Sequence, residues 1–227
     1  MLIDIEKYLP KQVSDVIFHS DVEREKIEDI VNGYMPFPFS GKNGILLYGR
    51  WGTGKTTLAR LLPDAIEQGK GGIEAGYEYI RCMQGVNGVT VMNNITAIAS
   101  VISFTLSGLH YFVIDEVDNL TESAQASLKS AMNYPNTVFV LTTNHIDKID
   151  KGIVNRCHEI DFNAAPPESW LPVANRMLDD MGVMDVSQEA LLEVIRTGKG
   201  AARDILNSVV QIGIKKLRNS GKLNVIY

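Results

Sequence analysis

One stretch of the chain has the residue types and spacing that bind phosphate groups. It reads Gly-x-x-x-x-Gly-Lys-Thr and consists of Gly49, Arg50, Trp51, Gly52, Thr53, Gly54, Lys55 and Thr56. Its glycines let backbone N–H groups approach phosphate oxygens, and the dipole of a following helix favours their negative charge. In this pattern Lys55 reaches the β- and γ-phosphates, and the Thr56 hydroxyl is a ligand of Mg²⁺. The spacing predicts a site for a nucleoside triphosphate with Mg²⁺, and we include the adjacent Thr57 among its binding residues.

Two acidic residues are placed to act on the same phosphate groups. Asp115 and Glu116 directly follow the apolar run 111–114, which has the pattern of a strand buried on both faces. Asp115 is predicted to hold Mg²⁺ together with Thr56, and Glu116 to orient or deprotonate a water that attacks the γ-phosphate. Acids after a strand often only solubilise a turn, but their combination with the phosphate loop favours hydrolysis.

An amide side chain follows the next strand pattern, which ends in Thr142-Thr143-Asn144. At that place Asn144 can hydrogen-bond both the attacking water and the γ-phosphate. A turn-forming asparagine is the simpler alternative, because asparagine favours strand ends. The residues alone leave both interpretations open.

Strand patterns alternate with helix patterns around these residues. Apolar runs predict strands at 45–48, 77–82, 111–114, 137–142 and 158–162. Helical spacing predicts helices over 21–31, 57–62, 91–104 and 121–132. This alternation predicts an α/β fold with a parallel sheet, in which functional groups gather at the carboxyl ends of the strands.

The pattern changes after the segment 163–167, which contains a Pro-Pro pair. Beyond it the apolar residues have only helical spacing, over 169–181, 187–196 and 201–218. We therefore expect a nucleotide-binding α/β domain at 1–164 and a small helical domain at 165–227.

Composition restricts the class of protein further. The 227 residues are 45% hydrophobic and 22% charged, which is ordinary for a soluble globular protein. We expect no secretory signal and no membrane span, because neither pattern is present in the sequence. The net charge of -5 argues against a polybasic nucleic-acid binder, so any DNA contact would use a local patch or an assembly. Two cysteines without metal-ligand spacing favour a reducing compartment, and we expect the cytoplasm of a bacterium or of a virus-infected cell, with the nucleus as the alternative.

The order of several short motifs resembles the AAA+ ATPases, and within them most closely the small subunits of sliding-clamp loaders. The motifs are Gly49–Thr56, Asp115-Glu116, Thr143-Asn144, Asn155-Arg156-Cys157 and Gly200-Ala201-Ala202-Arg203. The likeness starts at the opening segment 6–11, Glu-Lys-Tyr-Leu-Pro-Lys, includes Ala-Gln-x-x-Leu at 124–128, and covers essentially the whole chain.

The resemblance implies a three-layer αβα module with a central parallel sheet, followed by a small α-helical lid domain. It also implies roles for three residues: Asn144 as the sensor-1 residue, Arg156 as an arginine finger that enters the neighbouring subunit's site, and Arg203 as the sensor-2 arginine. The family's adenine pocket corresponds to Tyr8, Pro10, Val16 and Ile17.

Elementary electrostatics agrees with the roles of both arginines. Phosphoryl transfer needs positive charge beside the equatorial oxygens, and a guanidinium supplies it through planar paired donors. The simpler interpretation of Arg156 is a surface residue at a strand edge. For Arg203 it is an arginine in the first turn of a helix, where the dipole disfavours a cation.

The chain also departs from the family pattern. Leu9 replaces an arginine, Asn155 replaces a serine, and Arg50-Trp51 stand where the family often has Pro-Pro. Clamp-loader subunits continue into a helical collar domain, whereas this sequence ends at Tyr227. We expect these differences to bear on ring assembly and clamp loading, and to leave the ATPase core intact.

Three functions compete at this stage. The first is an ATP-hydrolysing, clamp-loader-like protein of DNA replication, whose partners are itself or related AAA+ subunits through Arg156, DNA, and a sliding clamp or other replication protein, with no membrane. The second is a nucleotide-switch adaptor that recruits a helicase, transposase or other DNA-processing partner. The third is a binding module that uses ATP structurally, and the combined presence of Glu116, Asn144 and the two arginines argues against it.

Overall fold

A computed structural model describes residues 4–83 and 88–221 of the chain. Its centre is a sheet of five parallel strands in the order β2-β3-β4-β1-β5. The strands are β1 (Gly44–Tyr48), β2 (Tyr77–Arg81), β3 (His110–Asp115), β4 (Thr137–Thr143) and β5 (Cys157–Asp161). This confirms the parallel α/β sheet that the apolar runs predict.

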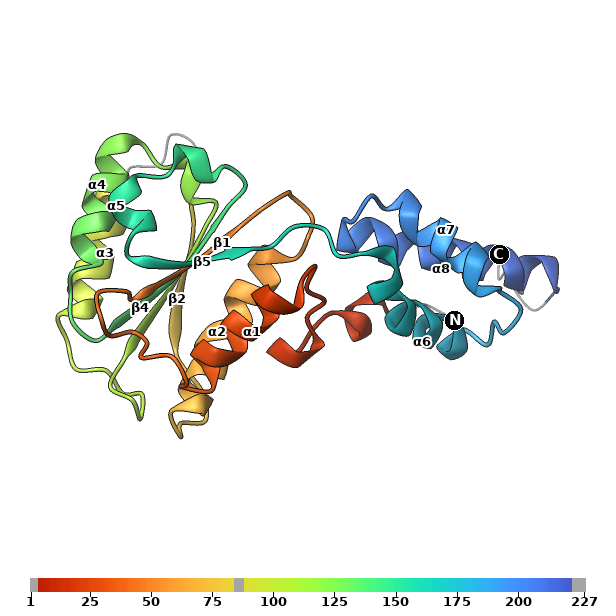
Figure 1. Ribbon diagram of the computed structural model, residues 1–227, viewed down its shortest axis with the longest axis horizontal. Helices are drawn as coiled ribbons and strands as arrows, with labels where there is room; N and C mark the ends of the chain where they lie inside the picture. Colours follow the sequence, from red (N-terminus) through yellow and green to blue (C-terminus); the bar gives the residue numbers. More distant parts are fainter. Residues whose placement is uncertain (1–3, 84–87, 222–227) are drawn as a thin grey trace, which may run out of the picture.

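Helices cover both faces of this sheet, which gives three layers (Figure 1). One face packs against α1 (Asp21–Val31) and α2 (Lys55–Gly69). The other packs against α3 (Gly88–Ala99), α4 (Glu122–Ala131) and α5 (Lys151–Val154). Because strand side chains alternate, odd-numbered residues of β3 face α2 and even-numbered ones face α4.

A third hydrophobic core holds the C-terminal helices together. These are α6 (Leu171–Asp180), α7 (Gln188–Thr197) and α8 (Ala202–Asn219), preceded by the 3₁₀ turn η5 (Pro167–Trp170). They form a group beyond α1 and α2 in Figure 1. Tyr8, from the N-terminal turn η1 (Ile5–Tyr8), packs into the same core, and its hydroxyl donates a hydrogen bond to Asp180 at 2.7 Å. The chain's opening segment is therefore attached to the helical part of the molecule.

Short 3₁₀ turns complete the connections, namely η2 (Val13–Asp15), η3 (Val117–Asn119) and η4 (Ile146–Lys148). Helix α4 begins where the sequence predicts, because the Thr121 side chain accepts a hydrogen bond from the Ala124 N–H. Within the described residues 4–83 and 88–221, no helix combines the length and hydropathy needed to cross a membrane.

One predicted helix is wrong at its end. The pattern over 91–104 predicts a helix to Phe104, but α3 ends at Ala99. The hydroxyls of Ser103 and Thr105 both donate to the Leu109 carbonyl, at 2.7 and 2.9 Å, which stabilises a loop instead. Serine and threonine compete with helical hydrogen bonds in this way.

Candidate active site

The phosphate loop connects β1 to α2 in a conformation that only glycine adopts without strain. Gly49, Gly52 and Gly54 have φ angles of 145°, 83° and 104°. A Cβ atom at Gly49 would lie 2.7 Å from the Phe162 carbonyl oxygen. The Thr53 hydroxyl donates to the same carbonyl at 2.8 Å, so the end of β5 supports the loop. The loop leads into the N-terminus of the 15-residue helix α2, where anions bind favourably.

Lys55 places a cation inside this loop. Its side chain is nearly buried, with 7% of the residue exposed. Its Nζ atom donates to the carbonyls of Gly49 and Arg50, at 2.9 and 2.6 Å. Burial lowers the pKa of Lys55 to about 8, while the charges of Asp115 and Asp118 act in the opposite direction. Because burial disfavours the charged form of Lys55, phosphate oxygens beside its Nζ atom would stabilise that form.

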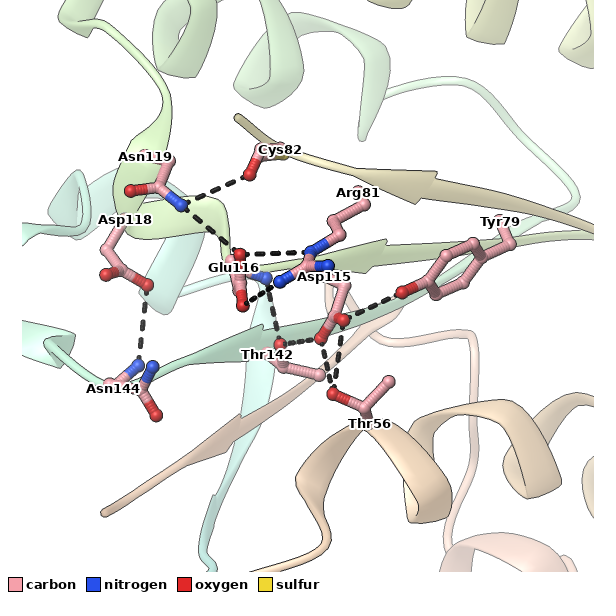
Figure 2. A network of polar contacts seen from close by, with 10 residues as sticks. All are labelled: Thr56, Tyr79, Arg81, Cys82, Asp115, Glu116, Asp118, Asn119, Thr142 and Asn144. Carbon is pink, nitrogen blue, oxygen red and sulfur yellow. Dashed lines mark hydrogen bonds and ion pairs between the residues drawn. The ribbon is translucent and has the colours of Figure 1, made fainter. Parts of the chain in front are cut away.

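Asp115 joins the loop to the central strands (Figure 2). The Thr56 hydroxyl donates to its two carboxylate oxygens, at 2.9 and 3.1 Å, and the Thr142 hydroxyl donates to Oδ1. The three residues come from α2, β3 and β4, so the sheet order brings them together. The contact of Thr56 with Asp115 agrees with the sequence, whereas the sequence does not predict the contact of Thr142.

A magnesium ion fits the oxygen atoms that meet at this point. Hydroxyl and carboxylate oxygens are the ligands that Mg²⁺ prefers, and Mg²⁺ usually takes one or two protein ligands together with substrate phosphates and water. Among the residues that the structure describes, no group of three or more His, Cys, Asp or Glu side chains is arranged to hold a metal. Thr56 and Asp115, whose oxygen atoms are in contact, would hold Mg²⁺ beside a bound triphosphate.

Glu116 has an unusual backbone conformation and an ion-pair partner. Its φ and ψ angles are 59° and 48°, a left-handed conformation that is rare for residues other than glycine. Its N–H donates to the Thr142 hydroxyl at 3.0 Å. Its carboxylate accepts two hydrogen bonds from the guanidinium of Arg81, at 3.0 and 3.3 Å (Figure 2). The sequence analysis missed Arg81, although it ends β2, the strand that pairs with β3.

Asn144 lies at the same edge of the sheet, one residue after β4 (Figure 2). Its backbone N–H donates to Asp118 Oδ1 at 3.4 Å. The Thr143 hydroxyl donates to the same oxygen at 2.8 Å. These bonds attach the end of β4 to the turn after β3, and so place Asn144 beside Asp118.

An apolar pocket lies beside the phosphate loop. All four residues predicted for the adenine pocket line it, together with residues of the loop and the helical part: Tyr8, Leu9, Pro10, Asp15, Val16, Ile17, Thr53, Gly54, Thr57, Phe162, Trp170, Val173, Ala202 and Leu206. The sequence analysis missed Trp170, whose Nε1 is buried without a hydrogen-bond partner among the described residues. A single tryptophan in a helical pattern does not indicate that its side chain lines a pocket.

Only one of the two predicted arginines lies near the phosphate loop of its own chain. Arg203 is exposed in the first turn of α8, next to Ala202, whose N–H donates to the Gly52 carbonyl at 2.9 Å. Arg156 instead precedes β5 at the amino edge of the sheet, and its guanidinium donates to Asn133 and to the Gly152 carbonyl. β1 and β5 run parallel for five residues, about 16 Å, so Arg156 is far from the loop of its own chain.

Two residues of the phosphate loop point away from its interior. Arg50 and Trp51 are exposed, and 70% of Trp51 is accessible to solvent. Arg50 contributes to the loop through its backbone carbonyl, which accepts a hydrogen bond from Lys55 Nζ.

Comparisons with known proteins agree with this geometry. Residues 45–163 match the family described as "ATPase family associated with various cellular activities (AAA)". The chain is 28% identical to mouse replication factor C subunit 5 over 209 residues, covering 89% of the chain and 58% of that protein. It is 28% identical to replication factor C small subunit 2 of Pyrobaculum islandicum over 207 residues, covering 90% and 61%. The chain thus spans about three fifths of the length of these relatives.

A solved structure is similar over most of the chain. The FIGL-1 AAA domain, crystallised in complex with ADP, superposes with a TM-score of 0.62 at 19% identity, and the match covers 93% of this chain and 76% of that one. At this identity the match bears on the fold alone, and it agrees with three layers followed by a helical part.

Proposed function

The chain belongs to the AAA family of ATPases, and we propose that it hydrolyses ATP in the presence of Mg²⁺, as a clamp-loader-like protein of DNA replication that works as an oligomer. One observation carries the proposal: the Thr56 hydroxyl of the phosphate loop and the Asp115 carboxylate are in direct contact, with Glu116 next in the chain. Phosphate binding, metal binding and a proton acceptor thereby meet at one edge of the sheet.

Each residue of the site has a proposed part in the reaction. Lys55 binds the β- and γ-phosphates, and Asp115 with Thr56 holds Mg²⁺, which neutralises phosphate charge when bound. Glu116 takes a proton from the attacking water, the γ-phosphate is released as inorganic phosphate, and ADP remains.

Three further residues are proposed to complete the site. Asn144 orients the attacking water, and Arg203 reaches the γ-phosphate from the helical part. A neighbouring subunit supplies Arg156, because that residue lies at the far edge of its own sheet. Tyr8, Pro10, Val16 and Ile17 bind the adenine in the apolar pocket.

We also propose that residues 1–164 and 165–227 act as nucleotide-binding domain and lid. The separate core of α6, α7 and α8 supports this division, and the Ala202 contact with Gly52 gives the lid access to the phosphate loop. Tyr8 belongs to the lid's core, so the opening segment would move with the lid.

An exposed apolar loop supports a protein partner. After α3, the side chains of Val101, Ile102, Phe104 and Leu106 are largely or fully exposed. The loop is held in place from beneath, since buried Glu67 accepts hydrogen bonds from the backbone N–H and hydroxyl of Ser107. A fixed loop that exposes apolar side chains is typical of a protein-binding surface. Since the similar proteins are replication factor C subunits, we propose a sliding clamp as the partner.

ATPase rates test the proposal. Phosphate release would be measured for the chain alone, with primed DNA, and with DNA plus the sliding clamp of the same genome. We expect the clamp to increase the rate, and Phe104→Asp to abolish that increase while leaving basal turnover unchanged. Met184→Asp is the matched control, because Met184 is also a largely exposed apolar residue and lies outside the loop.

Two controls separate the alternatives. Glu116→Gln should still bind ATP while turnover falls about a hundredfold, as expected on loss of a general base. Full stimulation by DNA without the clamp would favour the nucleotide-switch adaptor instead. Unchanged turnover in Glu116→Gln would contradict the catalytic assignment.

A further inference from the structure

Strand β2 contributes a second side chain to the acids, besides Arg81. The Tyr79 hydroxyl donates a hydrogen bond of 2.8 Å to Asp115 Oδ2 (Figure 2). Tyr79 pairs with Val113 in the β2–β3 register, two residues before Asp115, and both tyrosine and carboxylate lie on the sheet face that packs against α2. The contact therefore follows from the register of two adjacent strands.

Helix α2 holds the tyrosine from the other side. The guanidinium of Arg60 lies over the Tyr79 ring, 4.0 Å from its centroid, which is a favourable cation–π distance. Arg60 follows Thr56 by four residues, so both side chains lie on the same face of α2. The same helix face thus contacts Asp115 twice, directly through Thr56 and indirectly through Arg60 and Tyr79.

The hydrogen bonds around Asp115 leave the carboxylate one orientation. Oδ1 accepts from Thr142, Oδ2 accepts from Tyr79, and the Thr56 hydroxyl bridges the two oxygens. If the Tyr79 hydroxyl is removed, Oδ2 keeps only the longer bond from Thr56, and rotation of the carboxylate about its terminal torsion is less restrained.

We propose that Tyr79 is a positioning residue that fixes the Asp115 carboxylate for a divalent cation, and that Arg60 fixes Tyr79. Partners of metal-binding carboxylates typically change metal affinity by 10- to 100-fold when they are removed. The inference rests on the proposed function, in which Asp115 and Thr56 hold Mg²⁺. It adds that a strand outside the phosphate loop sets the affinity for the metal.

Metal binding, rather than turnover, provides the test. Binding of Mn²⁺ would be followed by electron paramagnetic resonance with ATP present, and binding of ATP would be measured separately without metal. For Tyr79→Phe we expect about tenfold weaker Mn²⁺ binding with metal-free ATP binding unchanged. Arg60→Met should weaken Mn²⁺ binding by a smaller factor, because it loosens the ring without removing the hydroxyl.

Tyr77→Phe is the matched control. Tyr77 lies two residues earlier on the same face of β2 and packs against the same core, so the variant loses a hydroxyl without touching Asp115. Its Mn²⁺ affinity should equal that of the parent chain, and equal melting temperatures would show that all variants fold.

Mn²⁺ affinity of Tyr79→Phe equal to that of Tyr77→Phe would overturn the inference. So would a joint loss of metal binding and metal-free ATP binding, because that indicates a general disturbance of the loop. Failure of the proposed function is a separate result: the parent chain itself would then show no metal-dependent ATP binding.

Discussion

Lys55 is a buried lysine, and its burial disfavours the charged form of the side chain. Burial lowers its pKa to about 8, which means that a substantial share of the free protein carries a neutral lysine slightly above physiological pH. A bound triphosphate would favour the charged form, since its oxygens add negative charge beside the ammonium group. Nucleotide binding is therefore coupled to protonation of this one side chain.

The coupling predicts that ATP affinity falls as pH rises. Below the pKa of Lys55 the lysine is already charged, and affinity should be constant; above it, ATP must bind together with a proton. From pH 7 to pH 9 we expect about a tenfold loss of affinity, measured by calorimetry or with a fluorescent ATP analogue. Lys55→Gln should bind weakly with no change over this range. A parent affinity that is constant to pH 9 would contradict the assignment.

At the scale of elements, the neighbours of a strand matter more than its place in the sequence. The sequence predicts the strands, most helices and the phosphate loop, because apolar periodicity and glycine spacing are local signals. It also predicts that Thr56 and Asp115 meet, because the loop and the acid each follow a strand pattern and the carboxyl ends of parallel strands lie at the same edge of the sheet. The structure places them in contact.

What the sequence analysis missed depends on sheet order. Tyr79 and Arg81 reach Asp115 and Glu116 because β2 pairs with β3 at the edge of the sheet. No local sequence pattern predicts that pairing. Trp170 reaches the pocket only because the helical part packs beside the loop. The predicted end of α3 is wrong because hydroxyl side chains, rather than apolar spacing, determine the loop after Ala99.

The pairing of β2 with β3 gives a prediction for basal activity. Arg81 holds the Glu116 carboxylate in a two-bond ion pair, which competes with any role of that carboxylate toward water. Arg81→Ala should therefore increase turnover of the chain alone, by about two- to fivefold, a modest factor because the pair is partly exposed and screened. Steady-state phosphate release would measure the change.

Arg81→Lys is the control for this prediction. Lysine keeps the charge but loses the planar pair of donors, so its turnover should lie between those of the parent and the alanine variant. The increase in Arg81→Ala should also shrink at high salt, since salt weakens the pair in the parent. A fall in turnover would show that Arg81 positions Glu116 productively.

At the scale of the whole molecule, the groups that we assign to one shared site lie at the two ends of β1. The phosphate loop and the acids lie at the carboxyl end, and Arg156 lies at the amino end beside Gly44. In the oligomer that we propose, copies would associate head to tail, so that each interface would join the loop of one copy to the arginine of the next. Hydrolysis in the proposed oligomer would then depend on assembly.

Mixing two inactive variants tests the shared site directly. Lys55→Ala loses phosphate binding in its own loop, and Arg156→Ala loses the cation that it supplies to its neighbour. In an equal mixture about a quarter of the interfaces join an intact loop to an intact Arg156, so phosphate release should recover to about that fraction of the parent rate. Mixing Arg156→Ala with a variant that carries both substitutions supplies intact loops but no Arg156, and should stay inactive. If the first mixture is also inactive, although both variants assemble with ATP analogues as judged by light scattering, Arg156 does not act across the interface.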